Sequence, residues 1–317
     1  MQKVLITGGT GFLGSHLVKR LLDREEVDYI VIPSTRIREN TSLKFLALES
    51  SKIHLIDGDI RDYDFVQRMF NEYEFDTVFH LGALTEVRKC QSNAKLAFET
   101  NINGTVNILE TARLQGGVNA IIVSSSDKAY GKGTLPYEET QPLRGDGVYE
   151  VSKSCTDLIA KSYFYNYELP VVVTRCSNLY GGGDSNFSRI VPNTIKHIFE
   201  NRRPVVWSGA QNFIREYLYV EDAVDAYLSL AENIKKTKGE AYNIGSGDKI
   251  TVIDLVYKII DKMSSGLAAV IKDRNFPEIN NQYLDSSKIK RDTGWEPKTS
   301  LDDGLDKTIK IYREILK

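Results

Sequence analysis

The chain has 317 residues, of which 41% are hydrophobic and 26% charged, a composition that excludes a disordered or collagen-like protein. The 41 Lys and Arg residues nearly balance the 43 Asp and Glu residues, so the net charge of −2 offers no basic excess for nucleic-acid binding. Every apolar run is shorter than the roughly 18 residues of a membrane span, and Met1 leads directly into Val4 without a basic leader. We therefore expect a cytoplasmic protein that binds neither nucleic acid nor membrane.

The first half of the sequence alternates short β-branched runs with longer amphipathic segments. Strands are predicted at residues 4–7, 29–32, 53–56, 77–80, 120–124 and 171–175, and helices at 14–23, 62–73, 93–115 and 149–167. Continuous apolar strands joined by helical crossovers are typical of parallel strands that are buried on both faces. The predicted fold class is therefore α/β, with a doubly wound parallel sheet.

The rhythm of the sequence changes after residue 180, where three glycines interrupt it. Helices are predicted near residues 190–201, 221–233, 251–264 and 301–316, and residues 242–244 have the composition of another core strand. The pattern predicts a large first domain over residues 1–179, with a returning segment at about 212–244, and a smaller region over 180–317.

Glycines follow the first predicted strand at regular spacing. Gly8, Gly11 and Gly14 satisfy Gly-x-x-Gly-x-x-Gly at a strand-to-helix turn, where the backbone can approach a pyrophosphate closely. We predict that these glycines, together with the intervening Phe12 and Leu13, bind a dinucleotide cofactor.

The residues about twenty positions past the last glycine bear on which dinucleotide binds, because NAD-specific sites usually place a carboxylate there. This chain has Ser34 and Arg36 instead, and an arginine with hydroxyl neighbours suits a 2′-phosphate, so we expect NADP in preference to NAD. Arg36 could also be a solvated loop residue. Further cofactor contacts are predicted after the third and fourth strands, at Asp59 and Ile60 and at Leu81 and Ala83.

Tyr149 and Lys153 lie four residues apart, which places both side chains on one face of a helix. A tyrosine can act as a base near neutral pH only if its phenolate is stabilised, and a neighbouring lysine can do this while also reaching a cofactor ribose. Ser126 supplies a hydroxyl at the end of the preceding strand.

His80 is predicted to be a packed residue. The three dispersed cysteines predict reduced thiols and no metal site.

Four further segments carry recognisable motifs: Thr100 to Thr105, Arg175 to Gly181, Arg215 to Asp222 and Thr293 to Pro297. With the glycine turn and the Tyr149/Lys153 pair, they make nearly the whole chain resemble the extended short-chain dehydrogenase/reductase family, in its branch that acts on nucleotide-linked sugars. The resemblance implies a Rossmann-like domain over 1–179 and a mainly substrate-binding region over 180–317.

The resemblance also implies roles for individual side chains. In this family the hydroxyl at the position of Ser126 hydrogen-bonds the sugar oxygen, Tyr149 removes its proton, and a hydride passes to the nicotinamide. Substrate contacts are implied at Thr85, Ser126, Asn178, Arg189, Val206, Arg215 and Arg274. Arg215 and Arg274 would clamp a pyrophosphate, for which a planar guanidinium is suited, although each could instead be a surface arginine.

The two residues after Ser126 decide the subclass within the family. Epimerases usually have small or apolar residues there, whereas 4,6-dehydratases carry an acid and a base, often Asp-Glu but Asp-Lys in enzymes similar to CDP-glucose 4,6-dehydratase. This chain has Asp127 and Lys128. Asp127 is predicted to protonate the departing C6 hydroxyl. Lys128 could remove the C5 proton only in its neutral form and would otherwise orient the sugar; a salt bridge between the two neighbours is the structural alternative.

The resemblance therefore implies a nucleotide-sugar 4,6-dehydratase acting on CDP-glucose or on a GDP-sugar such as GDP-mannose or GDP-GlcNAc. The motif around Arg215 is closer to epimerases and to dTDP- or GDP-sugar dehydratases, which leaves the nucleotide base open. The alternatives are an NAD(P)-dependent nucleotide-sugar epimerase, a 4-ketosugar reductase, and a catalytically dead regulatory or scaffold protein. The helices at 93–115 and 149–167 resemble those through which family members pair, so a homodimer is expected by analogy.

Overall fold

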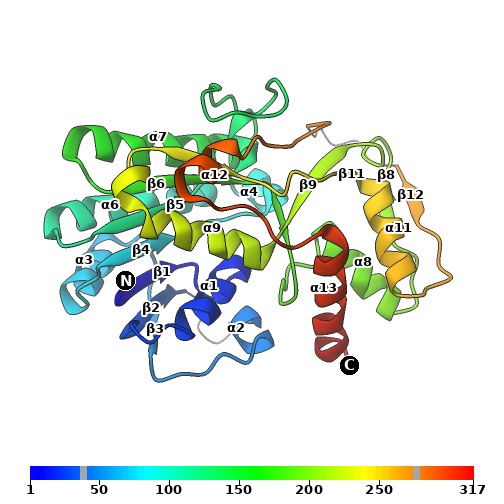
Figure 1. Cartoon of the computed structure of the whole chain (residues 1–317), viewed down its shortest axis with the longest axis horizontal. Coiled ribbons are helices and arrows are strands. Elements are labelled where there is room, and N and C mark those ends of the chain that lie inside the picture. Colours follow the sequence, from blue (N-terminus) through cyan, green and yellow to red (C-terminus); the bar gives the residue numbers. More distant parts are fainter. Residues whose placement is uncertain (36–40, 274–278) are drawn as a thin grey trace.

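The computed structural model describes residues 1–35, 41–273 and 279–317. A seven-stranded sheet forms its centre, as Figure 1 shows. Its strands, all parallel, follow the spatial order β10 (Ala241–Ile244), β6 (Val171–Cys176), β5 (Ala120–Ser124), β4 (Thr77–His80), β1 (Lys3–Thr7), β2 (Tyr29–Ser34) and β3 (Ile53–Asp57). The chain runs outward from β1 in both directions, so the predicted doubly wound topology is confirmed, including the core strand at 242–244.

Helices cover both faces of this sheet (Figure 1). Successive side chains of a strand point to opposite faces, so these apolar strands place hydrophobic side chains on both faces, and both must be covered. Val4 and Ile6 of β1 pack on the face covered by α1 (Phe12–Leu22) and α9 (Val220–Glu232). Leu5 packs on the opposite face, which α3 (Tyr63–Glu72), α6 (Gly104–Gln115) and α7 (Val148–Tyr167) cover. All these strand residues are fully buried, which explains their continuous apolar sequence.

The single helix predicted over 93–115 consists of three pieces. These are α5 (Ala94–Phe98), a π-helical turn over Glu99–Asn103, and α6. The wider turn leaves the Asn101 carbonyl oxygen to accept hydrogen bonds from the hydroxyls of Thr105 (2.7 Å) and Thr156 (2.8 Å). The Asn101 amide also donates to Ser152 Oγ over 2.9 Å. Because Thr156 and Ser152 belong to α7, the turn fixes the helix that carries Tyr149.

The smaller region lies to the right of the central sheet in Figure 1. It contains two small sheets that the sequence did not locate: β11 (Lys249–Thr251), β9 (Ile214–Tyr219) and β7 (Asn178–Tyr180), and the pair β12 (Val270–Lys272) and β8 (Val205–Trp207). The helices predicted there are confirmed as α8 (Ile190–Phe199), α11 (Val252–Lys262) and α13 (Leu301–Ile315). Shorter helices are α2 (Thr41–Phe45), α4 (Val87–Ser92), α10 (Ile234–Thr237) and α12 (Ser287–Thr293).

The prediction that His80 is a packed residue is confirmed. The side chain is buried, and its ring nitrogens lie 2.8 Å from Thr7 Oγ1 and 2.9 Å from Thr105 Oγ1. Burial lowers the pKa of His80 to about 3, so the imidazole stays neutral and serves to join β4, β1 and α6. Cys90, Cys155 and Cys176 are free thiols, as predicted.

Candidate active site

A cleft of about 1650 Å³ runs along the carboxyl ends of the central strands and is bounded on its other side by the smaller region. Ligands of doubly wound folds bind at this edge, where the strand order reverses. Most of the predicted site residues line it: Gly8, Gly11, Phe12, Leu13, Gly14, Leu81, Ala83, Thr85, Ser126, Asp127, Lys128, Tyr149, Asn178, Arg189, Val206 and Arg215. The cleft therefore joins the predicted cofactor, catalytic and substrate residues in one site.

The glycine turn forms the cofactor end of the cleft. Gly8 has a φ of +72° and lies against the backbone of Gly82, where any side chain would be 2.9 Å from the Gly82 nitrogen. A side chain on Gly14 would overlap the Gly8 carbonyl oxygen and come within 2.7 Å of Gly9 Cα. Gly11 precedes the first turn of α1, whose backbone N–H groups point toward an anion at that position. The turn therefore fits the pyrophosphate of a dinucleotide, which only a backbone without side chains can approach this closely.

Three residues predicted at the adenine end do not line the cleft. Ser34 ends β2 and is buried, with its carbonyl oxygen accepting a hydrogen bond from Gly58 N (3.2 Å). Ile60 is buried in the hydrophobic core on the face of the sheet that α3 and α6 cover. The Asp59 carboxylate accepts a hydrogen bond from Arg61 Nε (2.9 Å); partial burial alone would raise the pKa of Asp59, but the bonds to Arg61 hold it below its usual value. Arg36 lies outside the described residues, so these four cofactor roles stay predictions.

The predicted acid–base pair lies on a short 3-10 helix, η3 (Asp127–Tyr130), directly after β5. Ser126 caps this helix: its hydroxyl accepts a hydrogen bond from Lys128 N (3.2 Å) and donates one to Asp127 Oδ1 (3.0 Å). Asp127 is 3% exposed, and its Oδ2 has no hydrogen-bond partner within the described ranges. The salt bridge between neighbours is absent among the described residues, because Lys128 Nζ instead donates to Gln282 Oε1 over 3.0 Å.

Tyr149 occupies the first turn of α7 and faces the same group of residues. Burial raises the pKa of the Tyr149 phenol well above its ordinary value, and the nearby charge of Asp127 acts in the same direction. A hydrogen bond with Ser126 and the positive charge of Arg189 oppose this rise. The phenol thus lies against Ser126, and any proton transfer at this tyrosine depends on added positive charge or on a direct hydrogen bond to substrate.

Lys153 lies one helical turn further along α7 and is 4% exposed. Its ammonium donates to the carbonyl oxygen of Ser124 over 2.7 Å, and burial lowers the pKa of Lys153 to about 8. An ammonium carries three donors, so two remain for other partners. Lys153 does not form part of the cleft lining, and its predicted contact with the cofactor ribose stays a prediction.

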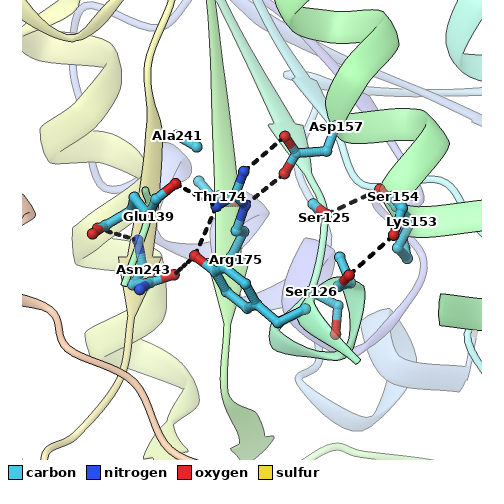
Figure 2. A network of polar contacts seen from close by, with 12 residues as sticks. Ser125, Ser126, Glu139, Lys153, Ser154, Asp157, Thr174, Arg175, Ala241 and Asn243 are labelled. Atoms are coloured by element: carbon cyan, nitrogen blue, oxygen red, sulfur yellow. Dashed lines mark hydrogen bonds and ion pairs between the residues drawn. The ribbon is translucent and has the colours of Figure 1, made fainter. Parts of the chain in front are cut away.

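A buried polar network connects the elements that carry these residues, as Figure 2 shows. The guanidinium of Arg175 on β6 donates to both carboxylate oxygens of Asp157 on α7, over 2.7 and 2.9 Å. It also donates to the hydroxyl of Tyr130, the last residue of η3, over 2.7 Å. Tyr130 in turn donates to Asn243 Oδ1 on β10 over 2.7 Å. The network ties the helix of Tyr149 to the helix of the acid–base pair.

Arginines and amides line the substrate end of the cleft. Arg215 is buried, and its guanidinium donates to the backbone carbonyl oxygens of Ile279 and Asn280, each over 2.6 Å. Arg189 pairs with Asp184 over 3.0 Å, and Asn178 Nδ2 donates to the carbonyl oxygen of Glu216 over 3.2 Å.

Val206 and Thr85 complete the predicted substrate set, Val206 as a buried part of β8 and Thr85 as an exposed residue after β4. Arg274 lies outside the described residues. Sequence reasoning missed Gln282, which is 1% exposed, lines the cleft and contacts Lys128. It belongs to no recognisable motif and follows Lys128 by 154 positions, so the sequence held no signal for it.

A doubly wound sheet with a glycine turn at its reversal point, together with Ser126 and Tyr149 in one cleft, defines an extended short-chain dehydrogenase/reductase. A family model described as GDP-mannose 4,6 dehydratase matches residues 5–308 of this chain. The chain belongs to this family, and the resemblance to the nucleotide-sugar 4,6-dehydratase branch is thereby confirmed.

Relatives of known activity span the whole chain. The dTDP-D-glucose 4,6-dehydratase of Homo sapiens is 32% identical over 327 residues, which cover 99% of this chain and 90% of the human protein. The dTDP-glucose 4,6-dehydratase of Streptomyces venezuelae, solved with NAD bound, superposes with a TM-score of 0.89 at 27% identity and covers 99% of this chain and 97% of its own. UDP-glucose 4-epimerase of Thermotoga maritima, solved with UDP-glucose, gives 0.90 at 26% identity, covering 99% of both chains. The fold alone therefore does not separate dehydration from epimerisation.

The glycine turn and the relative solved with NAD agree on a nicotinamide dinucleotide as the cofactor. In the part of the chain that the structure describes, no helix has both the length and the apolar character needed to cross a bilayer.

Proposed function

We propose that this chain is an NAD(P)-dependent 4,6-dehydratase that converts an NDP-hexose into the NDP-4-keto-6-deoxy sugar. The observation that carries this proposal is the position of Asp127 and Lys128, which follow Ser126 on one short helix and line the same cleft as Tyr149. An epimerase would use Ser126, Tyr149 and Lys153 but has no need of an acid–base pair beside them.

The first half of the reaction is oxidation at C4 of the hexose. The glycine turn of Gly8, Gly11 and Gly14 would hold the nicotinamide cofactor, whose chemistry would be to take up the hydride from C4 and to give it back at C6. Ser126 holds the C4 oxygen and Tyr149 removes its proton, which Arg189 favours by lowering the pKa of the phenol against the effect of burial. Lys153 supports this step from beneath the cleft, with an ammonium that still has donors for a ribose.

The second half is loss of water across C5 and C6. The C4 ketone makes the C5 proton acidic, and the departing C6 hydroxyl needs a proton to leave. Asp127 is placed to supply it from Oδ2, the carboxylate oxygen that Ser126 does not occupy. Lys128 removes the C5 proton when neutral, or orients the sugar when charged.

The sequence motifs and the relatives favour different nucleotide sugars as the substrate. The Asp-Lys pair favours CDP-glucose. The motif around Arg215 is closer to that of dTDP- or GDP-sugar dehydratases, which keeps a GDP-sugar such as GDP-mannose or GDP-GlcNAc open, and the relatives at 31–32% identity are dTDP-D-glucose 4,6-dehydratases. Arg215 would bind the diphosphate that all these substrates share, exchanging part of its bonding to the carbonyl groups of residues 279 and 280.

The preference for NADP rests on Arg36 and its neighbour Ser34. Replacing Arg36 with Ala should weaken the binding of NADP far more than that of NAD, because only NADP carries the 2′-phosphate that a guanidinium would pair with. Calorimetric titration of both cofactors into both proteins measures this difference. Equal losses for the two cofactors would defeat the preference.

A homodimer through α6 and α7 is the proposed assembly. These helices expose four large apolar side chains: Leu114, Leu158, Tyr165 and Tyr167, which are 55–70% exposed. A second copy covering them would remove this apolar area from water. Leu158→Glu should convert the dimer to a monomer in sedimentation equilibrium, and a wild type that sediments as a monomer would contradict the proposal.

The product mass tests the proposed function. The purified protein is incubated with CDP-, GDP-, dTDP- and UDP-sugars, including 2-acetamido forms, first without added cofactor and then with NADP or NAD. Loss of one water from one member of this panel establishes dehydration and names both base and sugar. An unchanged mass with an inverted carbon by NMR would instead establish the epimerase, whose fold this chain shares.

A further inference from the structure

Gln282 is a buried residue in the wall of the cleft, and its side-chain amide has no role in the proposed reaction. The side chain is 1% exposed and lines the cleft beside the acid–base pair. Its backbone N–H donates to the carbonyl oxygen of Ile214 over 3.1 Å, and Arg215 holds the two residues that start the segment, Ile279 and Asn280. The backbone that carries the side chain of Gln282 is therefore held against β9.

The two ends of this amide have different surroundings. Oε1 accepts a hydrogen bond from Lys128 Nζ over 3.0 Å. An ammonium can only donate, so this contact determines which end of the amide is the oxygen and leaves the NH₂ group at the other end. Within the described ranges, Nε2 is buried and has no acceptor. A buried donor without a partner costs free energy, so such a group inside a cleft points to a ligand that supplies the acceptor.

A second partnerless polar atom lies in the same wall. Asp127 Oδ2 is buried without a hydrogen-bond partner among the described residues, and Asp127 precedes Lys128 directly. Gln282 offers a donor, and Asp127 offers a carboxyl oxygen that accepts when ionised and donates when protonated. Together they match hydroxyl groups, which both accept and donate hydrogen bonds. A purely anionic ligand would satisfy only the Gln282 donor, and an apolar ligand would satisfy neither group.

We propose that Gln282 binds the hexose of the substrate, donating from Nε2 to a sugar oxygen while its Oε1 positions the ammonium of Lys128. The proposal rests on the proposed function, in that it assigns the hexose to the part of the cleft where Asp127 and Lys128 act. Gln282 thereby links recognition of the sugar to the placement of Lys128.

Two substitutions separate sugar binding from mere support of Lys128. Gln282→Met keeps the length of the side chain but removes both polar ends. Gln282→Glu keeps an acceptor for Lys128 and removes the donor. Gln141→Met makes the same amide-to-thioether change outside the cleft, where the Gln141 amide donates to Pro136 O over 3.1 Å, and serves as the matched control. Thermal unfolding followed by circular dichroism confirms that each variant is folded.

The measurement is calorimetric binding of the nucleotide sugar that the wild type binds most tightly, compared with the matching nucleoside diphosphate. Both Gln282 variants should lose about 10-fold in affinity for the nucleotide sugar relative to the diphosphate, as expected for one lost hydrogen bond to a ligand. The diphosphate comparison removes any effect of the added charge in Gln282→Glu. Gln141→Met should change neither affinity.

Three results would overturn the inference. The first is an equal loss of affinity for the nucleotide sugar and for the diphosphate in the variants, and the second is a wild-type affinity for the nucleotide sugar in Gln282→Glu. The third is a wild type that binds the nucleotide sugar no more tightly than the diphosphate. These results are separate from the fate of the proposed function. A chain that binds a nucleotide sugar through Gln282 but removes no water from it would retain this inference and lose the dehydratase assignment.

Discussion

Replacing Arg175 with Met would remove the positive charge from an ion pair that is shielded from water. The side chains of Arg175 and Asp157 are 2% and 0% exposed, and they share two hydrogen bonds of 2.7 and 2.9 Å. The variant would leave the Asp157 carboxylate buried without its counter-charge. Breaking such a pair from one side costs about 3–5 kcal/mol, so we expect a loss of that size in the free energy of unfolding.

Urea unfolding followed by circular dichroism measures this loss. Arg175→Met/Asp157→Leu, which removes both charges, should recover about 1–4 kcal/mol relative to the single variant, because no unpaired charge remains. Arg113→Met is the matched control: its pair with Glu110 is 30% and 28% exposed, so its loss should stay below about 1 kcal/mol. A loss below 1 kcal/mol in Arg175→Met, or no recovery in the double variant, would refute this reasoning.

Three further changes test the site. Asp127→Asn should leave cofactor binding and C4 oxidation largely intact but slow water elimination by about 100-fold or more, measured as product formation in single turnovers; an unchanged rate would remove Asp127 from the role of acid. Gly14→Ala should abolish NAD binding in calorimetry, because the new methyl group would come within 2.7 Å of Gly9 Cα, whereas Gly266→Ala meets nothing within 4 Å and should bind normally. Burial raises the pKa of Glu216 from 4.5 to about 7. Between these pH values Glu216 is ionised in the unfolded chain but still protonated in the folded one, so the free energy of unfolding decreases as the pH rises. Measured against Glu216→Gln, the wild-type free energy of unfolding should fall by about 3 kcal/mol between pH 4.5 and 7, and a pH-independent difference would contradict the assigned burial.

The central sheet was predictable because its strands are buried on both faces and therefore read as continuous apolar runs. All seven strands were located from this signal, including β10, which lies beyond a long excursion through the smaller region. The glycine turn was predictable because the close backbone contacts at Gly8 and Gly14 require glycine, and the spacing of these glycines is visible in the sequence.

The small strands β7, β8, β11 and β12 escaped prediction because each has only three residues, too few to show a period. The π-helical turn was hidden inside a helical pattern that continues through it. Arg175 carried one usable signal, a charge at the end of an apolar strand, but its partner Asp157 lies 18 residues away on another element. Contacts such as that between Gln282 and Lys128 exist only in the folded chain.

The most direct test of the dehydratase account follows a deuterium atom placed at C4 of the nucleotide sugar that the product panel identifies. Dehydration through this site moves the deuterium from C4 to C6, so the product should lose one water, keep the label and show it at C6 by NMR. Deuterium that remains at C4 would indicate epimerisation. Deuterium that leaves the sugar altogether would indicate net oxidation, and either result would contradict the account.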